Sequence, residues 1–331
     1  MTSSLTTALS PAKVALGNFD GVHLGHQAVI GQILHDAPQR DFSMSHVCGE
    51  ALESEPSLRF SGDRGDRVYA TVVSFHPHPQ EFFTGTARSL LTPVSEKVDL
   101  LRSLGVEQLV LLPFTRELAH LTPEAFIAEI LQRYLQTQRV SVGENFHFGR
   151  NRSGNSARLR QIAQDYDMET CIAGLHYLDG HRISSSTIRQ ALSEGQLEQA
   201  NRLLGRPYRL QGTVELGQQL GRTLGFPTAN LNLPSDKFLP RWGVYSAWAQ
   251  LDDGSKRPAV MNLGCRPTVA GDRPTVEVHL LDWQGDLYDR TLTLHLITYL
   301  RPEQQFPGLD ALKAQIHQDC QTARSHLQSL P

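Results

Sequence analysis

The stretch KVALGNFDGVHLGH, residues 13–26, decides the fold of the first half of this chain. Its first seven residues are typical of a short buried strand, and a glycine-rich turn and a helix from about His26 to Leu34 follow them. Open α/β sheets bind ligands where strands end and helices begin. Glycines let the backbone approach a phosphate, and the first N–H groups of a helix supply donors. The stretch therefore predicts a phosphate-binding turn at the carboxyl edge of a parallel sheet.

Strand and helix patterns alternate through the rest of the first half. Further strands are predicted where β-branched and other apolar residues run together, at 71–76, 107–114, 139–146 and 168–174. Helices are predicted at 95–105, 122–135, 156–166 and 185–195. This alternation predicts a doubly wound α/β domain, in which helices cover both faces of a parallel sheet.

The pattern changes near residue 205. Apolar and polar residues then alternate with period two in segments joined by short turns, at 206–216, 244–251, 257–264, 275–283 and 291–300. Such a run predicts a mostly antiparallel sheet or a small β-barrel, and residues 309–327 have the spacing of a terminal helix. We therefore expect two domains, at 1–204 and 205–331.

The composition restricts the function classes. The chain has 331 residues, 40% of them hydrophobic, which is enough for two globular domains. A net charge of −3 gives no basic field for non-specific binding to nucleic acid. No stretch approaches the ~20 apolar residues of a membrane span, and the first dozen residues lack a secretory pattern. We therefore expect a cytoplasmic protein with no membrane or nucleic-acid partner.

The spacing of the cysteines argues against disulfide bonds and against a structural zinc site. The four cysteines lie far apart with no CxxC pair or Cys/His cluster, at Cys48, Cys171, Cys265 and Cys320. Free thiols in a reducing compartment are expected, and a structural zinc site is not. Residues from about 37 to 67 form a long polar excursion that is typical of a surface loop.

Two histidines follow the glycine-rich turn. His23 and His26 are three residues apart and can stabilise negative charge that develops on a phosphoryl group in transfer. No GxxxxGK[ST] sequence is present, so the phosphates must be held in another way. Taken alone, two histidines in this position are more often surface residues of a tight turn.

The whole run GNFDGVHLGH, residues 17–26, resembles the HxGH-type nucleotidyltransferases, and in this extended form the bacterial FAD synthetase family. The resemblance implies that His23 and His26 are catalytic and that the turn binds ATP. The ATP-binding residues of the turn would then be Gly17, Phe19, Asp20, Gly21 and Gly25. The implied reaction is attack of the FMN phosphate on the α-phosphorus of ATP, which releases pyrophosphate.

Three further segments resemble the same family. Residues 183–189, ISSSTIR, are similar to its ISSTxxR element, whose hydroxyls and arginine would meet ATP phosphates. The residues concerned are Ser184, Ser185, Ser186 and Arg189. Residues 142–149, VGENFHFG, resemble a segment that brings Asn145 near the nucleotide, and residues 74–79, SFHPHP, one that approaches the flavin. Without the family, these are a serine-capped helix, a strand running into a loop, and a turn fixed by prolines.

The second half carries an independent motif. Residues 221–230, GRTLGFPTAN, resemble the GRxLGFPTAN segment of riboflavin kinases, whose fold is a small six-stranded barrel. The resemblance implies Mg²⁺ and ATP-phosphate binding by Thr228 and Asn230, and both offer the neutral hard oxygens that Mg²⁺ accepts. Nucleotide or flavin contacts are also implied for Gly221, Arg222, Gly225 and Pro227. The alternative is a turn rich in glycine and proline.

Glu277 lies in the predicted strand 275–283, on the face opposite Val276 and Val278. The resemblance makes it the general base that takes the proton of the ribityl 5′-hydroxyl. Read alone, it would be a solvent-facing carboxylate. Residues 262–268 resemble the NxGxRPT turn of the family and residues 243–245 its GVY strand start, and both are expected to support the site.

Together the motifs predict an enzyme that uses ATP and Mg²⁺ to convert riboflavin to FMN and then FMN to FAD. Three alternative functions fit the sequence less well. A class I aminoacyl-tRNA synthetase needs a KMSKS-like loop and a basic surface, and the sequence has neither. An adenylyltransferase for another phosphorylated small molecule leaves the PTAN half unexplained. A flavin-binding regulator would have lost motif residues that are all present here. The oligomeric state stays open.

Overall fold

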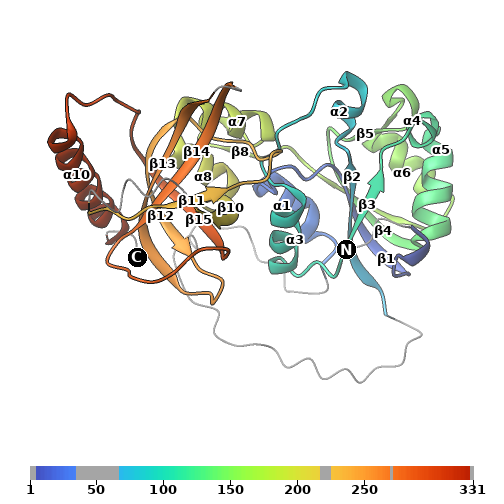
Figure 1. Cartoon of the computed structure of the whole chain (residues 1–331). Helices are drawn as coiled ribbons and strands as arrows, with labels where there is room; N and C mark the ends of the chain where they lie inside the picture. The colour runs from blue at the N-terminus through green and yellow to red at the C-terminus, as the bar shows by residue number, and fades with distance from the viewer. Residues whose placement is uncertain (1–4, 35–66, 217–224, 269–270, 329–331) are drawn as a thin grey trace. The chain divides into compact units, whose positions relative to one another are not determined.

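The computed structural model describes residues 5–34, 67–216, 225–268 and 271–328. The chain forms two compact units, Met1–Ser184 and Ser185–Pro331 (Figure 1). Several sequence predictions fall outside the described residues: Cys48, nearly all of the polar excursion at 37–67, and the first two motif residues of the kinase half, Gly221 and Arg222.

The first unit is built on a five-stranded sheet with the order β3-β2-β1-β4-β7. Its strands are β1 (Ala12–Leu16), β2 (Tyr69–His76), β3 (Gln108–Pro113), β4 (Thr137–Gly143) and β7 (Glu169–Ala173). All four pairings are parallel. The five strands predicted from apolar runs are confirmed, and because the chain first winds from β1 to β3 and then returns to β4, the order reverses beside β1.

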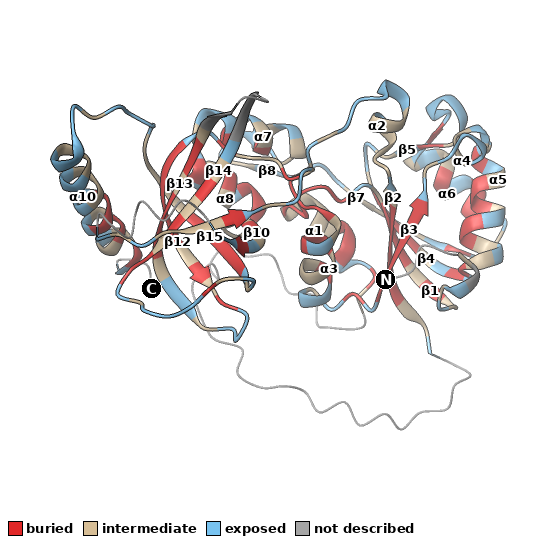
Figure 2. Ribbon diagram, viewed as in Figure 1, coloured by how far each residue is buried: buried red, intermediate tan, exposed pale blue. Residues whose placement is uncertain are grey.

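Helices cover both faces of this sheet (Figure 1). On one face, α1 (Leu24–Gly31) and α3 (Val94–Ser103) enclose a buried apolar cluster that includes Ile30 and Leu101. On the other face lie η1 (Leu5–Thr7), α5 (Pro123–Phe126), η2 (Ile127–Tyr134) and α6 (Ser156–Gln164). The doubly wound prediction is confirmed, and Figure 2 shows the buried strands between these layers. The predicted helix at 122–135 begins as an α-helix and continues as the π-helical η2.

Short elements that the sequence patterns did not predict complete the first unit. They are α2 (Pro79–Thr84), α4 (Arg116–His120), η3 (Arg150–Arg152) and two small antiparallel pairs. The pairs are β5 (His147–Phe148) with β6 (Gly154–Asn155), and β8 (Tyr177–Leu178) with β9 (His181–Arg182). Segments of two to six residues are too short to show a periodic pattern.

The second unit is a closed barrel with the order β10-β11-β14-β13-β12-β15. Its strands are β10 (Tyr208–Glu215), β11 (Ala229–Asn232), β12 (Gly243–Gln250), β13 (Lys256–Thr268), β14 (Gly271–Leu280) and β15 (Thr291–Arg301). All pairings are antiparallel. The predicted small barrel is confirmed with the six strands that the family resemblance implied. Helices α7 (Ser185–Glu194) and α8 (Leu197–Leu204) precede it.

One local prediction for the barrel is wrong. The motif at 262–268 was expected to form a turn, although its first three residues also end the predicted strand 257–264. All seven residues lie in β13, which runs to Thr268. This segment pairs residue by residue with β14, from Asn262 opposite Glu277 to Thr268 opposite Gly271. The ladder satisfies the backbone hydrogen bonds that a turn would leave to solvent, so the glycine and proline of this motif lie within a strand.

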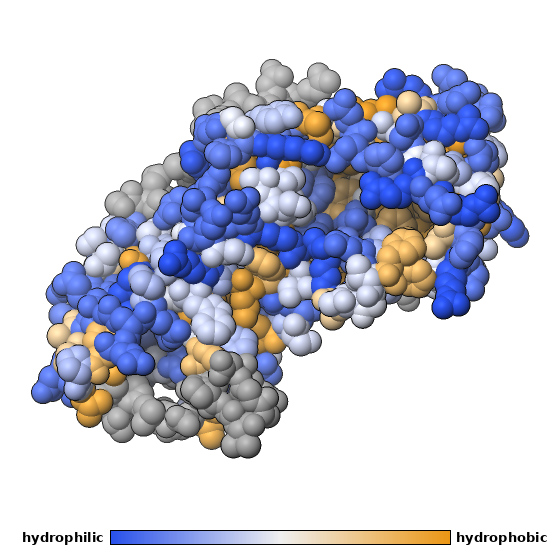
Figure 3. Space-filling model, turned by 90° about the horizontal axis from the view of Figure 1, so that it is seen from above, coloured by the Kyte–Doolittle hydropathy of each residue, from blue (hydrophilic) through white to orange (hydrophobic). Residues whose placement is uncertain are grey.

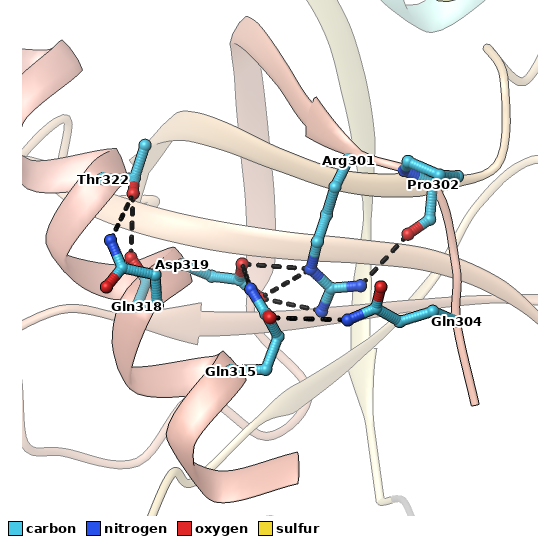
Figure 4. Close-up of polar contacts among 7 residues, drawn as sticks. All are labelled: Arg301, Pro302, Gln304, Gln315, Gln318, Asp319 and Thr322. Carbon is cyan, nitrogen blue, oxygen red and sulfur yellow. Dashed lines mark hydrogen bonds and ion pairs between the residues drawn. The ribbon is translucent and has the colours of Figure 1, made fainter. Parts of the chain in front are cut away.

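Helix α10 (Leu309–Gln328) packs on the outside of the barrel and confirms the predicted terminal helix. Its Cys320 and Ala323 form a buried cluster with barrel residues Val244 and Val260. Beside this cluster, the Arg301 guanidinium at the end of β15 binds both carboxylate oxygens of Asp319, with nitrogen–oxygen distances from 2.8 to 3.1 Å (Figure 4). An apolar contact and an ion pair thus fix the helix together.

The described part of the chain contains no helix that is long and apolar enough to cross a membrane. The three cysteines that the structure describes, Cys171, Cys265 and Cys320, carry free thiols. Burial raises the pKa of the Cys320 thiol to about 11.

The molecular face drawn in Figure 3 is mainly hydrophilic, with apolar side chains gathered in a few places.

Candidate active sites

The turn after β1 has an unusual backbone. Phe19 and Val22 have φ values of 47° and 42°, and Gly21 between them has φ of 97°. A left-handed backbone is rare for residues with a side chain, above all for a β-branched valine. Both side chains are 1% exposed, so the core holds them in place. Strain of this kind persists only where the surroundings over-determine it, and it gathers at ligand-binding sites.

Hydrogen bonds from neighbouring segments fix this turn. The Gly21 N–H donates to Thr92 Oγ1 over 2.9 Å, and the Thr92 N–H donates to Asp20 Oδ1 over 3.2 Å. The Asn18 carbonyl accepts from Lys97 Nζ and Ser74 Oγ. Asp20 is only 4% exposed, so its carboxylate contributes to the structure of the turn. Sequence reasoning missed Thr92 and Lys97, and it connected Ser74 with the flavin and not with this turn, since all three lie on segments far from the turn.

His23 and His26 open helix α1. His23 is the N-cap residue, and its Nδ1 accepts from the His26 backbone N–H over 3.2 Å. The two imidazole rings stack with centroids 3.6 Å apart and planes 12° apart. Because Nδ1 of His23 is the acceptor, a neutral ring carries its proton on Nε2. A Cβ at Gly25 would lie 3.3 Å from the His23 ring, so the glycine allows this close packing.

Motif residues follow both of the neighbouring strands, β1 and β4, between which the strand order reverses. β1, which leads to Gly17, pairs with β4, which leads to Asn145. In parallel sheets, ligands bind at the carboxyl edge where the order reverses. Asn145 is exposed, and its Oδ1 is 3.5 Å from the position of a Cβ on Gly143. The structure therefore brings the glycine turn and the Asn145 segment to the same edge of one sheet.

The ISSSTIR segment lies at the division between the units, which falls after Ser184. Ser185 and Ser186 form the first turn of α7, and Arg189 lies one turn further along. The Arg189 guanidinium stacks on the Phe238 ring, with 4.9 Å between the guanidinium carbon and the ring centroid. Ser185, Ser186 and Arg189 therefore belong to the second unit, and Ser184 belongs to the first.

A cluster of four phenylalanines lies at the carboxyl ends of β2 and β3. Phe75, Phe82 and Phe83 each contact Phe114 with ring centroids from 5.2 to 5.7 Å apart. Phe83 is 70% exposed, which is unusual for so large an apolar side chain. The SFHPHP segment begins in β2 and contributes Phe75 to the cluster. In this segment His76 is exposed, and His78 caps α2 by accepting from the Gln80 N–H. The cluster is thus a half-buried aromatic group with one exposed member, Phe83, and the motif at 74–79 pointed only to Phe75.

In the barrel, the polar motif residues form a row across three strands. Asn230 of β11 lies opposite Glu277 of β14, and Glu277 lies opposite Asn262 of β13. Residues that pair directly in an antiparallel ladder have Cβ atoms about 4.5–5.5 Å apart on the same face. Val276 and Val278 point to the buried face, as predicted, and Glu277 is half-buried on the other. Two amides and a carboxylate are therefore neighbours on one face.

The row is extended by Glu303, which follows β15. A Cβ at Gly264 would overlap the Glu303 carboxylate and lie 3.4 Å from Asn262 Nδ2. The glycine therefore gives the carboxylate room beside the Asn262 amide. The pKa of the Glu303 carboxyl is raised, because the effect of burial exceeds the opposing effect of the Arg301 guanidinium. Glu303 is a candidate site residue that sequence reasoning missed.

The PTAN segment is fixed from the next strand. His279 Nδ1 lies 2.8 Å from the Pro227 carbonyl oxygen, and the His279 and Phe226 rings meet edge to face at 5.7 Å. Gly225 has φ of 89°, a left-handed conformation that glycine adopts without strain. Thr228 and Asn230 are half-buried immediately after this turn. The motif therefore enters β11 with its polar side chains at the start of the strand.

Comparisons with known proteins agree with both halves. The FAD synthetase family model matches residues 5–49 and 60–187, and the riboflavin kinase family model matches residues 204–327. A bifunctional riboflavin kinase/FMN adenylyltransferase of Pseudomonas fluorescens is 38% identical over 311 residues, which cover 94% of this chain and 91% of the relative. The protein of the same name from Escherichia coli (strain K12) is 37% identical, with the same coverage.

A solved structure extends the likeness to three dimensions. The crystal structure of a macrolide-efflux protein from Streptococcus pneumoniae aligns with 98% of this chain and 97% of its own, with a TM-score of 0.79 and 26% identity.

The fold and the two motif sets define an ATP-dependent transferase with a nucleotidyltransferase half and a kinase half. The chain belongs to the bifunctional riboflavin kinase/FMN adenylyltransferase family. It is an enzyme that phosphorylates riboflavin to FMN and adenylylates FMN to FAD, with ATP and flavins as its substrates.

Proposed function

We propose that the two reactions occur at two separate nucleotide sites, one at the turn after β1 and one on the Asn230–Glu277 row of the barrel. The observation that carries this proposal is that the His23–His26 pair lies in the first compact unit and the Asn230–Glu277 pair in the second, and that the two pairs belong to different family motifs. We assign residues 1–204 to adenylyl transfer and 205–331 to the kinase, which the family matches at 5–49 and 60–187 and at 204–327 support.

In adenylyl transfer, an oxygen of the FMN phosphate attacks the α-phosphorus of ATP, and the bond to the pyrophosphate oxygen breaks. Negative charge grows on the oxygens of the transferred group. His23 donates to them from Nε2, since its Nδ1 is already an acceptor, and His26 stacks beside it. The family resemblance assigns Gly17, Gly21 and Gly25 to the phosphates, because glycine lets a backbone approach a ligand closely.

The remaining assignments for this site follow the family resemblance. Asn145 contacts the nucleotide, and Ser184, Ser185, Ser186 and Arg189 meet its outer phosphates. The aromatic cluster around Phe114 supports an approach of the flavin ring to the segment after β2, because aromatic faces favour stacking.

In the kinase reaction, Glu277 takes the proton of the ribityl 5′-hydroxyl as that oxygen attacks the γ-phosphorus, and ADP leaves. Thr228 and Asn230 would hold Mg²⁺. The residues fit this ion, since a hydroxyl and an amide carbonyl are hard oxygen ligands and the Glu277 carboxylate lies opposite Asn230. When bound, the ion would neutralise charge on the ATP phosphates. We propose a cytoplasmic location, which dependence on ATP supports.

The test is a separation of activities in the full-length protein. Thr228→Ala and Asn230→Ala should abolish formation of FMN from riboflavin and leave conversion of FMN to FAD within about threefold of wild type. His26→Ala should lower FMN adenylylation by about 10²–10³-fold and spare the kinase. Products are followed by chromatography, with the spared reaction of each variant as its folding control. If one change disabled both reactions in a folded protein, the two-site assignment would be wrong.

A further inference from the structure

Lys97 is a buried cation behind the turn that follows β1. It lies on α3 and is only 5% exposed. Its Nζ donates to the Asn18 carbonyl over 2.9 Å and lies 3.5 Å from Ser74 Oγ. Ser74, which is fully buried on β2, donates to the same carbonyl over 3.0 Å. Two buried donors from different elements therefore converge on one backbone oxygen of the turn.

Burying an ammonium group is costly unless it is paired. Burial lowers the pKa of Lys97 to about 8, and the Asp20 carboxylate opposes that shift. The group stays largely protonated near neutral pH. Asp20 is itself buried and accepts from the Thr92 N–H, so both charges belong to the packing of the turn.

The contacts lie beside the strained residues of the turn. Asn18 comes directly before Phe19, the first residue with a left-handed backbone, and Gly21 and Val22 follow with φ values of 97° and 42°. Such a backbone relaxes unless neighbouring groups hold it. The Asn18 carbonyl is held by Lys97 and Ser74, and the Gly21 N–H is held by Thr92. The hydrogen bonds thus brace the turn on both sides of Phe19.

We propose that Lys97 is a positioning residue for FMN adenylylation, which together with Ser74 holds the Asn18 carbonyl and so keeps residues 18–22 in the conformation that receives ATP. This inference rests on the assignment of the turn to ATP in the proposed function. Lys97 acts through the backbone and does not touch the reacting atoms. No motif identifies it, since a lysine in the predicted helix 95–105 would ordinarily be solvent-exposed.

The test uses Lys97→Met in the full-length protein, which keeps the length of the side chain and removes its charge. We expect kcat/KM for ATP in FMN adenylylation to fall between about 10- and 100-fold, mostly through a higher KM. The kinase constants measured on the same preparation should stay within about twofold of wild type. Ser74→Ala should shift the ATP KM in the same direction by less. The double variant should lose less than the product of the two single effects, since both donors serve one carbonyl.

Gln108→Leu is the matched control. Gln108 is also buried in the first unit, and its Nε2 donates to a main-chain carbonyl, of Leu9, and to a hydroxyl, of Thr71. It lies at the opposite edge of the sheet, at the start of β3. We expect Gln108→Leu to lower the melting temperature without raising the ATP KM. An equal rise in ATP KM in this control at a matched melting temperature would overturn the proposal.

An unchanged ATP KM in Lys97→Met would also overturn it. If Lys97→Met does not fold, Ser74→Ala decides, and an unchanged ATP KM there is the adverse result. His26→Ala distinguishes a failure of the inference on Lys97 from a failure of the site assignment. If His26→Ala loses adenylylation and Lys97→Met does not, the inference on Lys97 alone fails. If His26→Ala retains adenylylation, the assignment of the site fails, and the inference fails with it.

Discussion

Asn230 and Glu277 lie directly opposite each other in the ladder between β11 and β14. Their side chains therefore share one face of the barrel, and Asn262 continues the row on β13. Backbone pairing thus holds two functional groups side by side: an amide, which can bind a metal ion or a phosphate, and a carboxylate, which can accept a proton. The geometry of the pair is set by register, and side-chain contacts are not needed to define it.

Replacement of Glu277 by Gln should remove the general base and keep the shape of the row. We expect kcat for riboflavin phosphorylation to fall by about 10²–10⁴-fold with riboflavin affinity unchanged. Quenched-flow measurement of FMN and quenching of riboflavin fluorescence separate the two effects. Glu198→Gln removes an exposed carboxylate of α8 in the same unit and serves as control. A kcat within threefold of wild type would exclude Glu277 as the base.

The ion pair between Arg301 and Asp319 should stabilise the second unit (Figure 4). The two side chains are 18% and 7% exposed, so Asp319→Ala leaves a largely buried guanidinium without its carboxylate. We expect the free energy of unfolding to fall by about 1–3 kcal/mol in urea titrations. Asp282→Ala breaks a second Arg–Asp contact to α10 in which the carboxylate is 73% exposed, and should cost less than about 1 kcal/mol. Equal losses in the two variants would contradict this account.

Stability of the barrel should fall in mild acid through His295. Burial is the main cause that lowers the pKa of His295 to about 4, and the nearby cations Lys256, Arg209 and Arg206 contribute to the same shift. Since the folded-state pKa lies below the unfolded value, the unfolded chain binds the proton first. The stabilisation is therefore complete above pH 6.5 and is lost as the pH falls through 4.

The slope in that window is at most about 1.4 kcal/mol per pH unit for one proton. His295→Gln should remove this contribution from urea unfolding curves recorded between pH 4 and 7. His317→Gln on α10 serves as the matched histidine control. A wild-type slope in both variants would show that another group is responsible.

Gly243 begins β12 at a point where the backbone leaves no room for a side chain. Its φ is 146°, and a Cβ there would overlap the Arg301 carbonyl oxygen and approach the Tyr299 ring to 2.7 Å. Gly243→Ala should lower the free energy of unfolding by about 1–3 kcal/mol, because the clash is with backbone. Gly308→Ala, where nothing lies within 4 Å of the new Cβ, is the control. Calorimetric melting of the two variants compares them, and equal melting temperatures would disprove the predicted clash.

The parallel sheet could be predicted from the sequence because its central strands are buried on both faces and are therefore continuous apolar runs. Val72 and Val73 of β2, for example, are both fully buried although they point to opposite faces. Strand β11 could not be found in this way. It has only four residues, and its proline-containing approach is typical of a turn. The extension of β13 through residues 265–268 was hidden in the same manner by a proline, Pro267.

The candidate sites divide along a similar line. His23 and His26 could be predicted because a helix start keeps sequence neighbours together in space. The contacts of Lys97 and Ser74 with Asn18 could not, since they span 79 and 56 residues of chain. Glu303 likewise comes beside Asn262 only because Gly264 admits it. Contacts that depend on packing between elements leave no local pattern in the sequence.

The closed ring of six strands limits how the kinase half can change over evolution. An open sheet such as β3-β2-β1-β4-β7 can gain or lose an outer strand and still be a sheet, whereas a ring that loses one strand exposes two unpaired borders at once. Differences in length among relatives should therefore gather in connections such as residues 252–254, between β12 and β13, and the strand count should stay constant.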